Sequence, residues 1–198
     1  MLKKLNNIFL LSFIILFINS CEYSRIRYYS ILQFEDLNNQ QNKNINNIKN
    51  ESVGISTVEL SKVLNRPQIV FKISDSELKF EEISQWGGQL QEDVTQFVIN
   101  ELRKNHEKYN IFLYPSENRA KPKYQWFGEI KQLYGKKGAN SEIYFEGNCR
   151  IFDKNDGSVK FENQSSLVKK TEGDQIEDYI NAQRWLLKEW LKKCWWQE

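Results

Sequence analysis

Two stretches of the chain repeat apolar residues at helical spacing. The first covers residues 90–104, with Glu92 and Asp93 in its early turns and Arg103 and Lys104 near its end, a charge order that suits the helix macrodipole. Its apolar residues fall on one helical face: Leu90, Val94, Phe97, Val98 and Leu102. The pattern predicts an amphipathic helix.

The second helical pattern lies near the end of the chain. Gly173-Asp174 provides a cap, and Glu177 stands three residues further on, in the capping-box position. The apolar stripe that follows consists of Ile176, Tyr179, Ile180, Leu187, Trp190, Leu191 and Cys194. We expect a second amphipathic helix here.

The remaining apolar runs have the composition and alternation of β-strands. They occupy residues 28–34, 53–58, 69–73, 77–80, 110–114, 123–134, 141–152 and 158–171. In residues 141–152, strict alternation puts five residues on one face: Ile143, Phe145, Gly147, Cys149 and Ile151. Asn155-Asp156-Gly157 predicts a hairpin that joins this strand to the next.

The order of elements is strands, helix, more strands, helix. This order predicts an α+β fold, a two-layer domain in which two amphipathic helices pack on one face of a largely antiparallel sheet. We expect a single domain over residues 28–198, with the Asn-rich stretch 38–50 as a solvated loop.

The N-terminal residues 1–20 have the form of a secretory signal, with Lys3 and Lys4 ahead of a short apolar run. A single N-terminal anchor helix is the alternative, but the run is short for a membrane span. Ile18-Asn19-Ser20-Cys21 resembles a bacterial lipobox, which implies a lipid-modified Cys21 and a tether over residues 21–27. Glu22 stands where an aspartate would resemble an inner-membrane retention signal, and this favours the outer membrane.

Charge and motifs narrow the function classes. The chain has 28 Lys and Arg against 26 Asp and Glu, and removal of Lys3 and Lys4 leaves 26 of each, so charge gives no reason to expect nucleic-acid binding. His106 is the only histidine, and we expect it to be solvated. No metal-ligand spacing, Gly-rich phosphate loop or nucleophile elbow occurs, so we expect no enzyme activity, no cofactor and no metal.

Residues 64–90 combine a proline-fronted strand, a polar turn, a second strand, Trp86 and the start of the first helix. Together with the lipobox and the late strands, this stretch resembles the ABC-type transport auxiliary lipoprotein family, of the PqiC/YmbA type. Its most specific residues are Arg66-Pro67-Gln68-Ile69-Val70 and Trp86. The resemblance implies a non-enzymatic lipoprotein at the periplasmic face of the outer membrane. It also implies service to a system in which MCE-domain proteins carry lipids between the two membranes.

An interface for the MCE-domain partner is predicted on the proline-fronted hairpin, as a rigid, edge-like element. The candidate residues are Arg66, Pro67, Lys72, Lys79 and Trp86. Trp86 is either an aromatic anchor for the partner or a cap on the core beneath the helix.

A second class of function remains open. The chain is alternatively a lipoprotein that assists assembly of an outer-membrane barrel or a secretion machine, which would share the anchor and the fold class. Trp185 and Trp196 lie off the apolar stripe of the last helix and could contact a membrane, a partner subunit or nothing, so a homo-oligomer also remains open.

Cys149 and Cys194 are predicted to point into one layer if the last helix packs on the apolar face of the sheet. In an oxidising compartment they would form a disulfide. The alternative is two buried free thiols, each behaving as a small apolar residue.

Overall fold

The computed structural model describes residues 25–33, 51–115, 121–138 and 141–196. The signal segment, Cys21 and the Asn-rich stretch 38–50 lie outside these residues. The described elements are, in chain order, β1 (Arg27–Tyr29), β2 (Glu51–Ile55), β3 (Glu59–Leu60), β4 (Gln68–Lys72), β5 (Leu78–Trp86), α3 (Leu90–Asn105), β6 (Tyr109–Leu113), β7 (Tyr124–Lys136), β8 (Glu142–Asp153), β9 (Val159–Lys170) and α4 (Ile176–Lys192).

Strand β7 organises the nine-stranded sheet. One of its edges pairs with β8 in a long antiparallel ladder, and β8 pairs in turn with β9. Its other edge carries β2, β3 and β4 one after another, all parallel to it. A register shift between Ile130 and Gln132 changes which residues face the core, from Trp126, Gly128 and Ile130 to Leu133 and Gly135.

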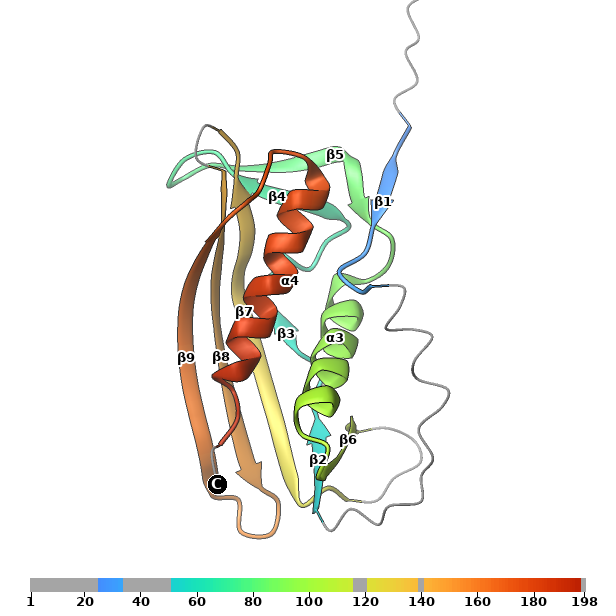
Figure 1. Cartoon of the computed structure of the whole chain (residues 1–198), viewed down its shortest axis with the longest axis vertical. Helices are drawn as coiled ribbons and strands as arrows, with labels where there is room; N and C mark the ends of the chain where they lie inside the picture. The colour runs from blue at the N-terminus through green and yellow to red at the C-terminus, as the bar shows by residue number, and fades with distance from the viewer. Residues whose placement is uncertain (1–24, 34–50, 116–120, 139–140, 197–198) are drawn as a thin grey trace, which may run out of the picture.

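The sheet is therefore mixed. Its two longest ladders are antiparallel, as predicted, whereas the pairings of β1 with β5 and of β2 with β6 are parallel. The α+β class with two helices is confirmed. The two-layer arrangement is visible in Figure 1, where α3 and α4 lie side by side over the sheet.

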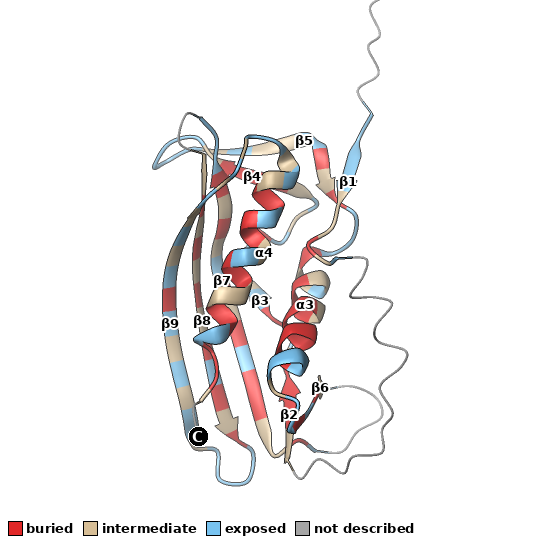
Figure 2. Ribbon diagram, in the orientation of Figure 1, coloured by how far each residue is buried: buried red, intermediate tan, exposed pale blue. Residues whose placement is uncertain are grey.

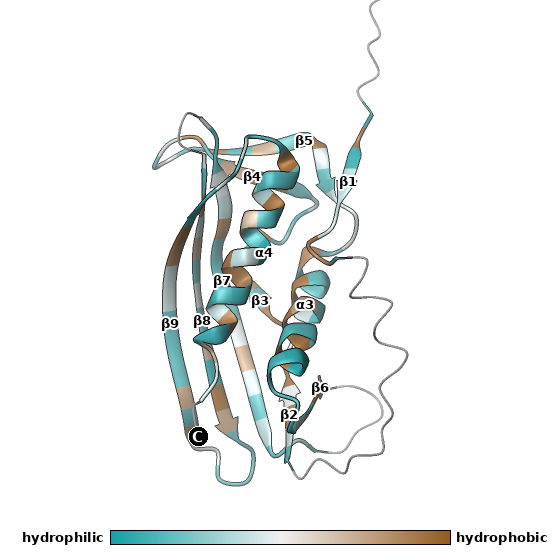
Figure 3. Cartoon of the chain, in the orientation of Figure 1, coloured by the Kyte–Doolittle hydropathy of each residue, from teal (hydrophilic) through white to brown (hydrophobic). Residues whose placement is uncertain are grey.

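Both helices bury the residues that their apolar stripes predicted. In α3 the five stripe residues are all buried. Of the seven stripe residues predicted for the last helix six are buried and only Ile176 is partly exposed, and the last of them, Cys194, lies just beyond the end of α4 (Figure 2). Hydrophobic and hydrophilic residues alternate around α4, the arrangement expected of a helix with one face on a sheet (Figure 3).

The start of α4 differs from the prediction by one residue. Gln175, not Asp174, is the N-cap, and its backbone N–H donates to the carboxylate of Asp178 at 3.1 Å. Asp178 rather than Glu177 therefore occupies the position that reaches back to the cap.

The core is densest where β7 passes beneath α4. Trp126 of β7 and Trp190 of α4 are fully buried, with ring centroids 5.7 Å apart. Gly128 leaves room for both rings, because a Cβ at that position would lie 2.3 Å from the ring of Trp126 and 3.0 Å from that of Trp190.

The molecule has two distinct ends (Figure 1). The β4–β5 hairpin and β1 lie at one end, where β1 begins. The last residues of α4 and the β8–β9 turn lie at the opposite end.

Candidate functional site

The predicted hairpin is present in the structure. β4 and β5 pair antiparallel, and the backbone N–H of Trp86 donates to the carbonyl of Pro67 at 2.7 Å. Pro67 is exposed immediately before β4. Proline is tolerated at the end of a strand because its missing backbone N–H is not needed there for pairing with a neighbouring strand.

The hairpin is only partly an edge of the sheet. β4 meets β7 at Phe71 and Lys72, and β1 covers the outer edge of β5 over Ser84 to Trp86. Among the described residues, no strand pairs with the outer edge of β5 over residues 78–83. This stretch is the open backbone edge of the hairpin.

Trp86 is not an exposed anchor. Its side chain is 5% exposed, because it is the last residue of β5 and points, like Ser84, to the face that the helices cover. The alternative interpretation of Trp86, as a cap on the core, agrees with this position. A partner that docks on the hairpin would not reach this ring.

The four other predicted interface residues lie on the hairpin surface. The Arg66 guanidinium stacks over the Phe80 ring, 4.1 Å from its centroid. At the other end of the hairpin, the Nζ of Lys72 lies 2.7 Å from Asp75, and that of Lys79 lies 3.5 Å from Glu81.

The tip of the hairpin, residues 73–77, is exposed throughout. It presents Ile73 between Lys72 and Asp75. The hydrogen bond from Lys72 lowers the pKa of Asp75, and the tip carries this pair of opposite charges beside an apolar side chain. The open edge, the tip with Lys72, and Arg66-Pro67 together form what we call the hairpin surface.

A groove that the sequence did not predict lies between β1, the β5–α3 connection and α4. Its volume is about 600 Å³. The apolar part of its lining includes Tyr28, Tyr29, Leu32 and Ile180, and the polar part includes Asp93 and Arg184. Burial raises the pKa of Asp93, an effect that the hydrogen bond from Ser30 partly opposes.

Arg184 joins the wall of this groove to the N-terminal segment. Its guanidinium donates to the backbone carbonyls of Ser30, Ile31 and Leu32, at 2.8, 2.9 and 3.2 Å. No sequence pattern marks this role, because the partners are backbone atoms about 150 positions earlier in the chain. A lone arginine on the polar side of a helix is ordinarily only solvated.

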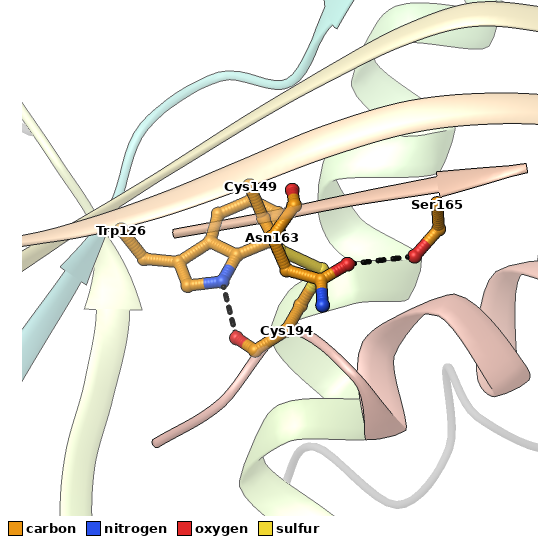
Figure 4. Close-up of a disulfide and its surroundings, with 5 residues drawn as sticks. All are labelled: Trp126, Cys149, Asn163, Ser165 and Cys194. Atoms are coloured by element: carbon orange, nitrogen blue, oxygen red, sulfur yellow. Dashed lines mark hydrogen bonds between the residues drawn. A yellow bond between two sulfur atoms is a disulfide. The ribbon is translucent and has the colours of Figure 1, made fainter. Parts of the chain in front are cut away.

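Cys149 and Cys194 form a disulfide in the structure, with their Cα atoms 5.8 Å apart. Figure 4 shows Trp126 beside the bridge, where its indole N–H donates to the carbonyl of Cys194 at 3.1 Å. The bridge therefore holds the end of α4 against the centre of the sheet.

The residues after the disulfide pack on the end of α3 and on β6. The Trp195 ring stacks on His106 at 4.0 Å between centroids and on Trp196 at 4.7 Å. His106 is half-buried, so the prediction of a solvated side chain was wrong, and burial lowers its pKa. Trp196 also contacts Tyr109 and Tyr124, whereas Trp185 remains exposed with Lys169 over its ring.

Within the described part of the chain, no three His, Cys, Asp or Glu side chains gather as a metal site. In the same residues, no helix combines the length and apolar character needed to cross a membrane.

Solved structures with the same fold share little sequence with this chain. An uncharacterized protein matches with a TM-score of 0.68 at 11% identity, over 85% of this chain and 95% of its own. A protein from Xanthomonas campestris matches with a TM-score of 0.60 at 10% identity, over 71% of this chain and 79% of its own. At such identities the likeness concerns the fold alone.

A search of curated proteins returns no match. The family model described as the ABC-type transport auxiliary lipoprotein component matches residues 36–193, which include both helices and all the strands except β1. This chain therefore belongs to the family of ABC-type transport auxiliary lipoprotein components.

Proposed function

We propose that this protein is the lipid-anchored auxiliary component of an MCE/ABC-type transport system that moves lipids between the inner and outer membranes. The observation that carries the proposal is the family match over residues 36–193, to which the lipobox-like Ile18-Asn19-Ser20-Cys21 adds an anchor. The protein would act by binding, not by catalysis.

Cys21 is the proposed point of attachment, and the periplasmic face of the outer membrane is the proposed location. The Cys149–Cys194 disulfide supports a location outside the cytoplasm, because disulfides persist in oxidising compartments such as the periplasm. Glu22 after the lipidated residue supports the outer membrane.

The hairpin surface is the proposed contact with the MCE-domain partner. The outer edge of β5 over residues 78–83, with which no described strand pairs, offers backbone donors and acceptors to an added strand. Lys72, Lys79 and exposed Ile73 at the same end supply charged and apolar side chains for specificity. Pro67 and Arg66 would border this contact, whereas Trp86 would support it from the core side.

Capture of the full-length protein from its own cells after mild crosslinking tests the proposal. An MCE-domain protein in the crosslinked fraction is the expected result, and genes for an MCE protein, a permease and an ATPase are expected beside its own. A barrel-assembly or secretion component in place of the MCE protein would overturn the proposed system.

The proposed anchor needs a separate test. Cys21→Ser should abolish fatty-acid labelling and release the protein from membranes. Undiminished labelling of this variant would overturn lipidation at Cys21 without affecting the family assignment.

A further inference from the structure

Three exposed apolar side chains gather where the described chain begins. Ile26 is 47% exposed and Tyr28 66% exposed, and Ile83 of β5 is 42% exposed. We call these three residues the tether patch. Isolated exposed apolar residues are ordinary on protein surfaces, so the arrangement of the three matters more than their number.

The strand register puts the three on one face of the sheet. β1 runs parallel to β5 with Arg27 opposite Ser84 and Tyr28 opposite Gln85. One step back along both strands, Ile26 lies opposite Ile83, and alternation puts Tyr28 on the same face as Ile26. Ser84 and Trp86 point to the other face, into the core, so Ile26 and Ile83 face away from the helices, whereas exposed Tyr28 lies at the border of the patch, where it also lines the groove beside α4.

The patch is also close to the proposed lipid anchor. Arg25 is four positions after Cys21, and a fully extended chain spans at most about 3.6 Å per residue, or about 14 Å in all. β1 begins at one end of the molecule (Figure 1). A domain held on so short a tether keeps this end within reach of the lipid headgroups.

The charges beside the patch suit a phospholipid surface. Arg25 and Arg27 alternate with Ile26 and Tyr28, so they project from the opposite side of the edge strand β1, and both are exposed. Within the described residues, neither arginine takes part in an ion pair. Phosphate groups attract such arginines, and tyrosine rings favour the boundary between headgroups and acyl chains.

We propose that the tether patch lies against an anionic phospholipid surface, with Arg25 and Arg27 at the border of the contact, and fixes how the domain stands on its membrane. This inference rests on the proposed lipid anchor at Cys21. The occupant is the bilayer, because the short tether brings the bilayer to the patch without any further partner. The contact orients the hairpin surface, which lies at the same end of the molecule.

The test compares a label in the patch with a label far from it, on the full-length lipidated protein. With Cys21 lipidated and Cys149 bonded to Cys194, a cysteine introduced as Ile83→Cys is the only thiol available to a fluorescent label. Phe127→Cys is the matched control, since Phe127 is 40% exposed. Phe127 lies nine positions before Lys136, the last residue of β7, and therefore about 30 Å along the strand from it.

Both labelled proteins are reconstituted into vesicles of phosphatidylethanolamine and phosphatidylglycerol that contain a lipid with a nitroxide quencher on its headgroup. Quenching at position 83 should exceed that at position 127 about threefold, because the quencher acts only near the interface. Replacing phosphatidylglycerol by phosphatidylcholine, or changing Arg25→Gln together with Arg27→Gln, should reduce the difference.

The outcomes separate the patch from the anchor. Vesicle-bound protein with equal quenching at positions 83 and 127 overturns the membrane contact and leaves the anchor intact. Protein that does not sediment with the vesicles overturns the anchor and the contact together. In detergent, a label at position 83 that becomes more protected from quenching as the protein concentration rises would assign the patch to a second copy of the chain. This result would also overturn the proposal.

Discussion

Arg184 of α4 binds the backbone carbonyl of Ile31 at 2.9 Å, across 153 positions of sequence. The same guanidinium also binds the carbonyls of Ser30 and Leu32, so the segment that follows β1 is held to the last helix. Because the proposed anchor lies just ahead of β1, this contact joins the membrane end of the chain to the helical layer. A force applied through the tether would therefore act on α4 as well as on the sheet.

Replacing Arg184 by alanine should lower the free energy of unfolding by about 2–3 kcal/mol, because partly buried carbonyls lose a charged donor. Arg184→Lys should recover only part of that loss, since an ammonium lacks the planar fork of donors. Chemical denaturation of the two variants measures both effects.

Arg150→Gln is the control for Arg184, because Arg150 pairs with Glu162 on an exposed surface where such a pair contributes at most about 1 kcal/mol. Equal losses in Arg184→Ala and Arg150→Gln would show that the three carbonyl contacts contribute no more than a surface ion pair.

Gly128 should not tolerate a side chain. Gly128→Ala places a Cβ 2.3 Å from the Trp126 ring and 3.0 Å from the Trp190 ring, both fully buried, and we expect a loss of about 1–3 kcal/mol in stability. Gly88→Ala is the matched control, since its nearest neighbour is an Asp93 oxygen at 3.7 Å, an ordinary contact. Similar melting temperatures for the two variants would contradict the tight packing at Gly128.

The disulfide gives a third prediction. Denatured, unreduced protein should show no reactive thiol at Cys149 or Cys194, and two reactive thiols would rule the bridge out. The bridge spans 45 positions, for which the chain-entropy model gives about 4 kcal/mol as an upper figure. Denaturation with and without reductant should therefore show a lower stability of the reduced protein.

His106 should make stability depend on pH near neutrality. Burial, with the charge of Lys108, lowers the pKa of His106 in the folded protein below its ordinary value of 6.5. The unfolded chain therefore takes up a proton at a pH where the folded protein does not, so the free energy of unfolding falls as the pH decreases through about 6.5. Urea denaturation between about pH 5 and pH 8 measures this slope.

His106 is the only histidine, so His106→Gln is a direct control for that slope. The variant should lose the part of the slope that lies near the ordinary histidine pKa. An unchanged slope in the variant would assign the dependence to carboxylates.

The sequence predicted which side of each element is buried better than it predicted which elements meet. Alternation assigned Cys149 to the core face of β8, and helical spacing assigned Cys194 to the end of the buried stripe of α4, so both sulfurs were expected in one layer. By contrast, nothing in a period-two pattern says that β2, β3 and β4 share one edge of β7. That arrangement depends on contacts between residues far apart in the chain.

The candidate site was predicted only in part for the same reason. The hairpin and its lysines follow from local turn and strand chemistry, which the sequence shows directly. Trp86 remained open between a partner anchor and a core cap, because a tryptophan before two glycines carries no sign of the strand parity that buries it. Arg184 could not be found from sequence, since its partners are backbone carbonyls and any residue type supplies those.

The central claim is that this lipoprotein serves an MCE-domain partner through the hairpin surface. Its most direct test is the affinity of the full-length protein for that partner, measured for wild type, for Lys72→Glu with Lys79→Glu, and for Arg150→Glu as a control on the opposite side of β7. The account predicts at least about a tenfold loss of affinity, or about 1.4 kcal/mol, for the hairpin variant. The control should bind as wild type does, and both variants should keep the fold. Wild-type affinity in the hairpin variant would contradict the account.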